Sequence, residues 1–466
     1  MMVYSIIENT LIIKSDYKND FDEEIKKIIV SNKISDIKIY SFECEILNKL
    51  NFTGSNIKSI IISSSSREKY LGQNINGNNE NKIINLDYLP ITLESFEIAN
   101  SYKELRLDPK IINNLPPKLK KLKLYTCEDV SLENLPNTLE ILNISCFSNQ
   151  TNILDYLPTS LKKLNIKITK VFKPTENNVF VNNKPEIKFD VCKGINFDSL
   201  PSGLESLIIT GEYSGELNCL PIGLKILYLP SVYKSEIKNI PETLTELKIP
   251  LEYDFLNNFK VYTNLKKITI GFSFKQHSSI KSKFDLKKIP NSIEEIEFGD
   301  QFNQDIDILP INIKKITFGF NFKPTFIVLS DSIENLEFGY NFNGIIKKYP
   351  SNLKYLKFGR NFNQCINNLP EGLISLSINE RFHNKIYKLP STLEILEFDK
   401  FAQYKHDITF IPDSVNMIIL GKYMEKNKIN IPKNLKNITY PKNNMWIKEQ
   451  LDSIGFIGVI NIIEPH

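Results

Sequence analysis

The chain has little of the chemistry that enzymes and metalloproteins use. Its 466 residues include only four histidines and six cysteines, and neither type recurs at the spacing of a metal site. The sequence also lacks a nucleophile elbow and a phosphate-cradling glycine loop. It therefore predicts no catalytic residue, no metal and no cofactor, and a protein that is not an enzyme.

The chain is also poor in net charge and in long apolar runs. Its 58 basic side chains nearly balance the 54 acidic ones, whereas nucleic-acid binding needs a clustered basic surface. No apolar run approaches the ~20 residues of a membrane span, and the N-terminus does not have the pattern of a secretory signal peptide. We expect a soluble, intracellular protein that binds neither nucleic acid nor membrane.

The cysteines are scattered without paired spacing, which indicates buried or half-buried reduced thiols rather than a disulfide framework. They are Cys44, Cys127, Cys146, Cys192, Cys219 and Cys365.

What the sequence does contain is one short phrase that returns sixteen times, most often every twenty residues. An apolar residue and a proline open it, and three apolar positions follow at fixed offsets. A period this short and strict predicts a solenoid, in which each repeat contacts its neighbours. Position zero of each coil is the proline or its replacement: Pro90, Pro116, Pro136, Pro158, Pro201, Pro221, Pro241, Tyr262, Pro290, Pro310, Ser330, Pro350, Pro370, Pro390, Pro412 and Pro432.

Three positions of each coil are apolar in every copy, as in Leu353, Leu356 and Phe358 at +3, +6 and +8. The last two share the two-residue period of a strand with one buried face. Twenty residues are too few for a strand and a crossover helix, so the return path should be mostly extended. The sequence predicts a mainly β, right-handed parallel solenoid with short helical caps.

The rest of the coil is equally regular. Glycine at +9, as in Gly359, suggests a turn that needs positive φ. An aromatic column at +12, such as Phe342, should fill the core, and the asparagines at +13, such as Asn343, should hydrogen-bond from coil to coil.

These motifs resemble two known families. The strand segment L-x-x-L-x-[LIF] is similar to the strand half of a leucine-rich repeat. Phe-Asn, a later Ile and a closing Leu-Pro resemble the FNIP repeat of amoebae and of the giant viruses that infect them. The best copies are FGDQFNQDIDILP, FGYNFNGIIKKYP and FGRNFNQCINNLP, and the resemblance covers about residues 83–440.

The FNIP resemblance implies a protein-interaction scaffold or adaptor, placed in the host cytoplasm if the protein is viral. Its partner would be a ubiquitin-pathway substrate or a host protein. Members often carry an N-terminal F-box, but residues 1–50 lack its leucine-rich, proline-initiated helical pattern. The alternative is a carbohydrate-binding or polysaccharide-processing β-solenoid, which needs carboxylates and aromatics clustered in a groove.

Three regions are expected along the chain. Residues 1–53 form an N-terminal cap, 54–440 the solenoid, and 441–466 a C-terminal cap. Insertions at 63–82, 168–195 and 275–283 interrupt the rhythm, and in repeat proteins such insertions decorate one face. The second of them suggests a hairpin through 179–181 and 187–191.

The caps should each contain a short helix. The first is expected over 19–30, after Asn19 or Asp20 as N-cap. The second should begin after Asn444 and stop at Gly455, with Trp446, Ile447, Leu451 and Ile454 on its inner face. A last strand over 456–463 would then cover the final coil.

Position +4 carries acids and bases that alternate almost coil by coil, as in Glu294, Lys314, Glu334 and Lys354. In a parallel stack these side chains are direct neighbours, so we expect a structural charge ladder. Apolar residues interrupt its face in the C-terminal coils, and contiguous exposed apolar residues mark interaction surfaces. The candidate partner-binding residues are Tyr355, Ile374, Ile395, Met417 and Ile419.

Two further features remain open at this point. Ile208, Ile226 and Tyr228 form a second apolar set on the same face. Cys365 and His383 lie one coil apart, but a thiol and an imidazole without an orienting third group are weak evidence for a nucleophile. We expect a monomer with one protein partner, whose identity the sequence does not specify.

Overall fold

The computed structural model describes residues 3–464, except 16–22, 32, 42–51, 53, 64–82, 85–88, 100–105, 108, 125–130, 148–151, 170–179, 182–183, 186–193, 256–258, 260, 272–283, 307 and 425. The chain divides into two compact units, Met1–Leu244 and Thr245–His466. Each unit is described by itself below.

The first unit is a stack of short parallel strands that begins with one antiparallel pair. β1 (Val3–Ile7) pairs antiparallel with β2 (Thr10–Ser15). From β2 onward each strand pairs in parallel with the next. These strands are β3 (Asp36–Ser41), β4 (Ser59–Ser63), β6 (Ser95–Ala99), β8 (Lys121–Leu124), β9 (Ile141–Phe147), β10 (Lys163–Thr169), β13 (Ser206–Gly211) and β14 (Ile226–Tyr228).

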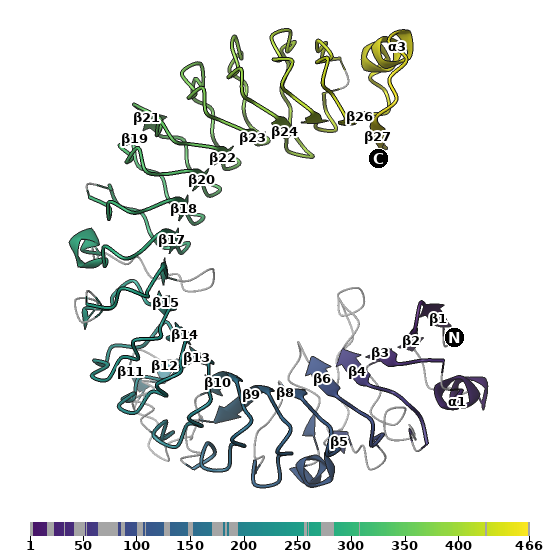
Figure 1. Ribbon diagram of the computed structural model, residues 1–466, viewed down its shortest axis with the longest axis vertical. Helices are drawn as coiled ribbons and strands as arrows, with labels where there is room; N and C mark the ends of the chain where they lie inside the picture. Colours follow the sequence, from purple (N-terminus) through teal and green to yellow (C-terminus); the bar gives the residue numbers. More distant parts are fainter. Residues whose placement is uncertain are drawn as a thin grey trace. The chain divides into compact units, whose positions relative to one another are not determined.

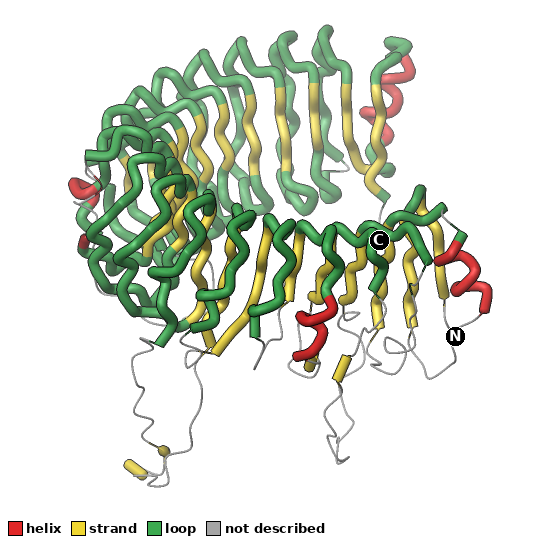
Figure 2. The backbone as a smooth tube through the Cα atoms, turned by 60° about the horizontal axis from the view of Figure 1, so that its bottom comes forward, coloured by secondary structure: helices red, strands yellow, loops and turns green. Residues whose placement is uncertain are grey.

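The second unit repeats the same parallel arrangement. Its strands are β15 (Glu246–Ile249), β16 (Lys267–Ile270), β17 (Glu295–Phe298), β18 (Lys315–Thr317), β20 (Asn335–Glu337), β22 (Tyr355–Lys357), β23 (Ser375–Ile378), β24 (Ile395–Phe398), β25 (Met417–Ile419), β26 (Asn437–Pro441) and β27 (Val459–Ile463). Figures 1 and 2 show successive strands side by side within each unit, with loops closing every coil. The predicted mainly β parallel solenoid is confirmed.

Small elements lie on the return path of the coils. Two pairs of short strands are parallel: β5 (Ile83–Ile84) with β7 (Arg106–Leu107), and β19 (Phe326–Ile327) with β21 (Ile345–Ile346). Short 3₁₀ helices cover Pro109–Asn114 and Leu286–Lys288. These short strands and 3₁₀ helices agree with the prediction that twenty residues leave no room for a full crossover helix on the return path.

The core consists of the apolar positions that the repeat predicts. The side chains at +3, +6 and +8 are buried, for example Leu353, Leu356 and Phe358. The described rings of the aromatic column at +12 are buried as well, for example Tyr213, Phe302 and Phe382. Two sets of isoleucines with the same spacing precede the sixteen copies and are buried in the same way: Ile34, Ile37 and Ile39, and Ile57, Ile60 and Ile62.

Backbone hydrogen bonds explain why the proline opens each coil. The Pro350 carbonyl accepts from the N–H of Leu353 at 3.2 Å, which closes a turn into the strand. Proline fixes φ there and gives up an N–H that the sheet does not need. The Glu334 carbonyl of the preceding coil then accepts from both Lys354 and Tyr355, at 2.8 and 3.0 Å. Each coil is thus attached to the one before it at the start of its strand.

The glycines at +9 correct one prediction. Of the +9 glycines that the structure describes, only Gly271 has positive φ, at 87°. Gly359 is required instead by a close approach, because a Cβ on it would lie 1.7 Å from the carbonyl oxygen of Gly339. A Cβ on Gly339 would likewise lie 1.9 Å from the carbonyl oxygen of Gly319. The backbones of successive coils meet there, so a side chain does not fit.

The asparagines at +13 hydrogen-bond from coil to coil, as predicted. The Asn343 Oδ1 accepts from the Asn363 N–H at 2.8 Å, and the Asn363 Oδ1 accepts from the His383 N–H at 2.9 Å. The Asn363 Oδ1 also accepts from Asn384 Nδ2 at 3.0 Å. A second set of amide bonds lies two positions earlier, at +11. There Asn361 Nδ2 donates to Asn341 Oδ1 at 2.9 Å.

The caps agree only in part with the sequence. α1 (Glu23–Val30) buries Ile29, while its predicted N-cap residues lie outside the described ones. α3 (Met445–Ser453) begins at Asn444, whose side chain accepts from the Ile447 N–H at 3.1 Å. Gly455 follows it with φ of 59°. Ile454 was predicted to face inward, but it is the C-cap of α3 and is exposed.

The insertions are described only in part. Most of the first insertion (63–82) and all of the third (275–283) lie outside the described residues, because these exclude 64–82 and 272–283. In the second, β11 (Phe180–Val181) pairs antiparallel with β12 (Lys184–Pro185). A hairpin is therefore present, but its second arm precedes the predicted one, which is not described.

Candidate functional site

The exposed face of the second unit carries the charge ladder that the sequence predicts at +4. Glu294 lies between two bases, 3.2 Å from the Lys266 ammonium and 2.7 Å from that of Lys314. These two hydrogen-bonded lysines lower the pKa of the Glu294 carboxyl. Glu334 and Lys354 form the next pair at 2.7 Å. The first unit has the same pairs at Glu94–Lys120, Glu140–Lys162 and Glu205–Lys225.

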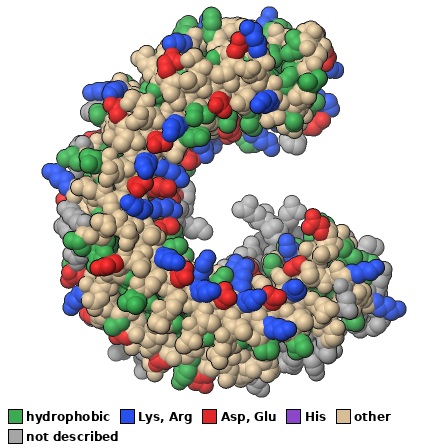
Figure 3. Space-filling model, viewed as in Figure 1, with side chains coloured by type: hydrophobic (Ala, Val, Ile, Leu, Met, Phe, Trp, Pro, Cys, Tyr) green, Lys and Arg blue, Asp and Glu red, His purple; other side chains and the backbone are tan. Residues whose placement is uncertain are grey.

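Further ion pairs lie beside the ladder, at +5 and +7. In the second unit they join Lys267 to Glu246 at 2.7 Å, Lys315 to Glu295 at 3.5 Å, and Lys357 to Glu337 at 2.6 Å. Figure 3 shows basic and acidic side chains next to each other over β17 and β18. Because these carboxylates are held by lysines, they do not form the acidic groove that a polysaccharide-processing site needs.

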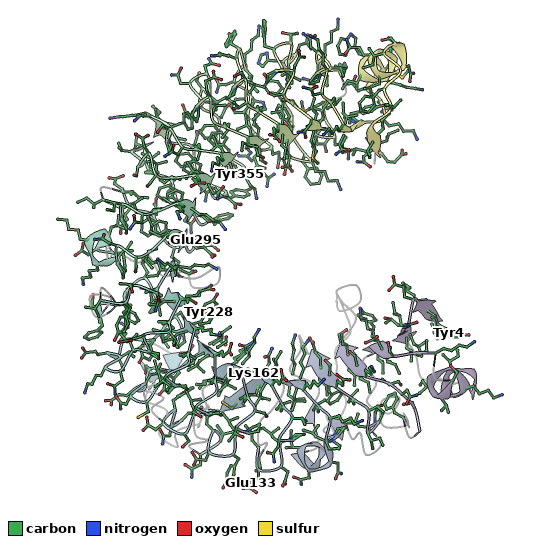
Figure 4. All side chains as sticks on the ribbon, in the orientation of Figure 1. Tyr4, Glu133, Lys162, Tyr228, Glu295 and Tyr355 are labelled. Atoms are coloured by element: carbon green, nitrogen blue, oxygen red, sulfur yellow. The ribbon has the colours of Figure 1, made fainter. Side chains whose placement is uncertain are left out.

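Apolar side chains interrupt the charges from β22 to β25. The register places Tyr355, Ser375, Ile395 and Met417 next to one another on successive strands. Tyr355 is 47% exposed, while Ile395 and Met417 are half-buried. Figure 4 shows Tyr355 on the strand side of its unit, as it shows Glu295. In the first unit, the same figure places Lys162 and Tyr228 on the strand side and Glu133 on the loop side.

Two more residues extend this apolar strip. Ile374 takes the ladder position between Lys354 and Glu394. Its N–H donates to the Lys354 carbonyl, and its carbonyl accepts from the Glu394 N–H. Ile419 lies on the outer side of β25, beside Glu397 in the register. We call Tyr355, Ile374, Ile395, Met417 and Ile419 the C-terminal patch. The sequence named all five, and the structure brings them onto neighbouring strands of one face.

Charged and polar side chains surround the C-terminal patch. Lys354 and Lys357 lie on either side of Tyr355, and each is paired with a glutamate of the coil before. Glu394 lies next to Ile395 and accepts from Asn416 Nδ2 at 3.3 Å. A shallow hollow continues from there, lined by Thr392, Glu394, Ser414, Asn416, Lys433, Asn434, Leu435 and Lys436. The patch therefore has an apolar centre and a polar margin.

The remaining chemical candidates do not form a site in the described part of the chain. The thiol of Cys365 is exposed. The pKa of Tyr349 is raised mainly because its hydroxyl is buried, and secondly by the charge of Cys365. The His383 N–H donates to Asn363, and no contact joins its ring to Cys365 among the described residues. The same residues contain no cluster of three or more possible metal ligands. None of the described helices is long and apolar enough to cross a membrane.

The described cysteines differ from the expectation. Cys146 is buried, and burial raises the pKa of its thiol to about 12. Cys219 and Cys365 are exposed, contrary to the prediction that the thiols are buried or half-buried. All three are free thiols, as predicted. They lie on different coils, so nothing brings them together.

Sequence reasoning missed a column of larger side chains at +10. The rings of Phe320 and Tyr340 stack with centroids 4.5 Å apart. The Arg360 guanidinium donates to the Tyr340 hydroxyl at 2.7 Å and forms an ion pair with Glu380. The twenty-residue period of these four residues was the signal that could have revealed the column. It binds four successive coils together rather than forming an open site.

Comparison with known proteins supports the repeat assignment. The FNIP Repeat profile matches residues 283–321 and 342–381. The chain therefore contains FNIP repeats in these two segments. The matched segments contain two of the clearest copies quoted above, and the second overlaps the start of the C-terminal patch.

Solved structures of leucine-rich-repeat proteins are also similar to this chain. CroV588, described as a novel circular LRR protein, is 19% identical with a TM-score of 0.43, over 94% of this chain and 77% of that one. YopM from Yersinia enterocolitica is 15% identical with a TM-score of 0.38, over 91% of this chain and 88% of that one. No curated protein matches the sequence.

Proposed function

We propose that this protein is a non-enzymatic scaffold that binds another protein through the C-terminal patch. One observation carries this proposal. Ion pairs occupy the exposed face from β15 to β22, and at β23–β25 Ile374, Ile395, Met417 and Ile419 take several of the same positions, beside the remaining Glu394 and Glu397. An unbroken ladder would serve stacking alone, so its interruption by apolar groups calls for another reason.

The layout of the C-terminal patch suits a protein partner. Interfaces have an apolar or aromatic centre, which supplies most of the binding energy, and a polar rim. Here Tyr355, Ile395 and Met417 form the centre, while Lys357 and Glu397 lie at its margin. The partner should present an apolar anchor flanked by charges of both signs.

The family resemblance narrows the kind of partner. It favours a ubiquitin-pathway substrate, or a host protein if the chain is viral, and a meeting place in the cytoplasm. No described residue of this chain supports either choice over the other, so the proposal itself rests on the patch alone.

Capture of the partner tests this function. The tagged full chain is used to capture proteins from the source cell, and mass spectrometry identifies those bound. The double variant Ile395→Glu/Met417→Glu should lose the partner while its melting temperature stays near that of the wild type. The matched control is Ile311→Glu/Val328→Glu, two residues that are 75% and 60% exposed and lie outside the patch.

One result would overturn the proposal: capture by the patch variant at the wild-type level. The insertions at 63–82 and 168–195 would then be the next candidates, and their deletion would be compared in the same assay.

A further inference from the structure

Both terminal strands of the chain expose apolar side chains. In β27, Val459 is 56% exposed, Ile460 42% and Ile462 52%. In β1, Ile6 is 48% and Ile7 59% exposed. Among the described residues β27 pairs only with β26, and β1 only with β2. Within the described part of the chain, each strand therefore has one side of its backbone without a neighbouring strand.

Neither edge has the usual protection against added strands. Natural edge strands carry inward-pointing charges, lysines, prolines or bulges that prevent pairing with another chain. β1 reads VYSII and β27 reads VINII, with no charge and no proline in either. An edge of this kind is a template for a further strand, and the two edges are equal in length.

The two edges also match each other side chain by side chain. β27 runs parallel to the other strands of its unit, and β1 runs antiparallel to β2. Suppose that β27 of one copy pairs with β1 of another, and that the parallel strands of both copies run in the same direction. β27 and β1 are then antiparallel to each other. Directly opposite residues of such a pair lie on the same face.

The inner faces agree in this pairing. Ile460 and Ile462 continue the rows of the buried Ile438 and Tyr440. On β1 the inward residues are Ile6 and Tyr4, opposite the buried Leu11 and Ile13. A register that sets Ile460 against Ile6 also sets Ile462 against Tyr4, so that apolar groups meet on the core side.

The outer faces agree as well. The same register sets Val459 against Ile7 and Asn461 against Ser5. An apolar pair thus lies beside a polar pair, and no charge faces an apolar group.

We infer that this protein associates head to tail with a second copy of itself, β27 of one chain pairing with β1 of the next. This replaces the monomer expected from the sequence. The contact uses different surfaces on the two chains, so it is heterologous and leaves one free edge at each end of a dimer. It is separate from the C-terminal patch, and neither proposal depends on the other.

Sedimentation velocity of the full chain, over a range of concentrations, measures this association. The wild type should show masses above the 53.9 kDa of one chain, increasing with concentration. Ile460→Lys/Ile462→Lys blocks β27, and Tyr4→Lys/Ile6→Lys blocks β1, so each variant alone should remain a monomer. The control Ile457→Lys changes a fully exposed residue outside the paired register and should associate as the wild type does.

Mixing the two blocked variants gives the decisive result. Each retains one intact edge, so an equal mixture should form a dimer and nothing larger. A wild type that stays at the mass of one chain at every concentration overturns the inference. Dimers in the β1-blocked variant alone do so too, because they would show β27 pairing with itself.

A second measurement keeps the inference testable if a blocked variant fails to fold. Ser5→Cys and Asn461→Cys are made in separate chains in which Cys219 and Cys365 are replaced by serine. Under mild oxidation the mixture should form a disulfide between positions 5 and 461, identified by peptide mass spectrometry. Absence of this disulfide, in folded chains, contradicts the pairing.

Discussion

The ring of Phe342 stacks on the ring of Phe338, with centroids 3.8 Å apart and planes 8° apart. Phe342 also stacks on the rings of Phe322 and Phe362 in the neighbouring coils, at 5.9 Å each. Its replacement by alanine removes a fully buried side chain and should cost about 3–5 kcal/mol of unfolding free energy. Urea denaturation measures this, and Glu334→Ala, which removes a half-buried ladder carboxylate, serves as control with a much smaller effect. The reverse ranking would contradict the assignment of buried and exposed positions.

Gly359 tests the close approach of successive coils. Alanine at this position would place its Cβ 1.7 Å from the Gly339 carbonyl oxygen, so the backbone must shift. We expect Gly359→Ala to lower the unfolding free energy by more than about 1 kcal/mol. Gly372→Ala is the matched control, because the nearest atom to its Cβ would be 3.7 Å away. Equal effects of the two substitutions would show that contact between coils is not the reason for glycine.

Asn444 should be the most sensitive polar residue of the C-terminal cap. It is fully buried, accepts from the Ile447 N–H, and donates to the carbonyls of Met424 and Asn427, at 3.0 Å each. Asn444→Ala removes the helix cap and takes a donor from both carbonyls, of which that of Met424 keeps only the Asn427 N–H. We expect a cost of about 1–3 kcal/mol. Its exposed neighbour Asn443→Ala should be nearly neutral in the same denaturation experiment. A neutral Asn444→Ala would mean that the cap does not stabilise α3.

Glu371 makes stability depend on pH. The N–H and the hydroxyl of Ser391 and the ammonium of Lys388 bond to its carboxylate, and they lower its pKa from 4.5 to about 2. A lowered pKa stabilises the folded chain above pH 4.5, and this contribution is lost as the pH falls from 4.5 to about 2. Wild type should therefore melt above Glu371→Gln at pH 7, and the difference should vanish near pH 2. A difference that is the same at both pH values would contradict this role.

Much of the fold could be predicted because the solenoid repeats one local rule. The +6 position, occupied by Leu356 in one coil, is buried in each copy, so its role does not depend on distant parts of the chain. The same reasoning failed where a contact between coils determines which residue fits. Gly359 was read as a turn residue, whereas the backbone of the preceding coil excludes a side chain there. Ile454 follows the helical pattern inward but lies at the end of α3, where the core stops.

Contacts between coils were also the hardest part of the polar structure to predict. The hydroxyls at +2, as in Thr138 and Ser160, donate to the carbonyl at +3 of the preceding coil. Short polar residues at +2 gave no sign of this, because the same types suit any turn. The C-terminal patch could be identified since it breaks a periodic charge pattern. The open edges of β1 and β27 could not be identified from the sequence, because they depend on which strands are the last to pair in the sheet.

The affinity of the captured partner for the C-terminal patch tests the central claim most directly. With the purified partner, isothermal titration should give a Kd for Ile395→Glu/Met417→Glu at least about 100-fold weaker than for the wild type, since buried interface anchors contribute about 2 kcal/mol or more each. The control Ile311→Glu/Val328→Glu should bind as the wild type does. Equal affinity of all three proteins would show that the partner binds elsewhere and would contradict the proposed function.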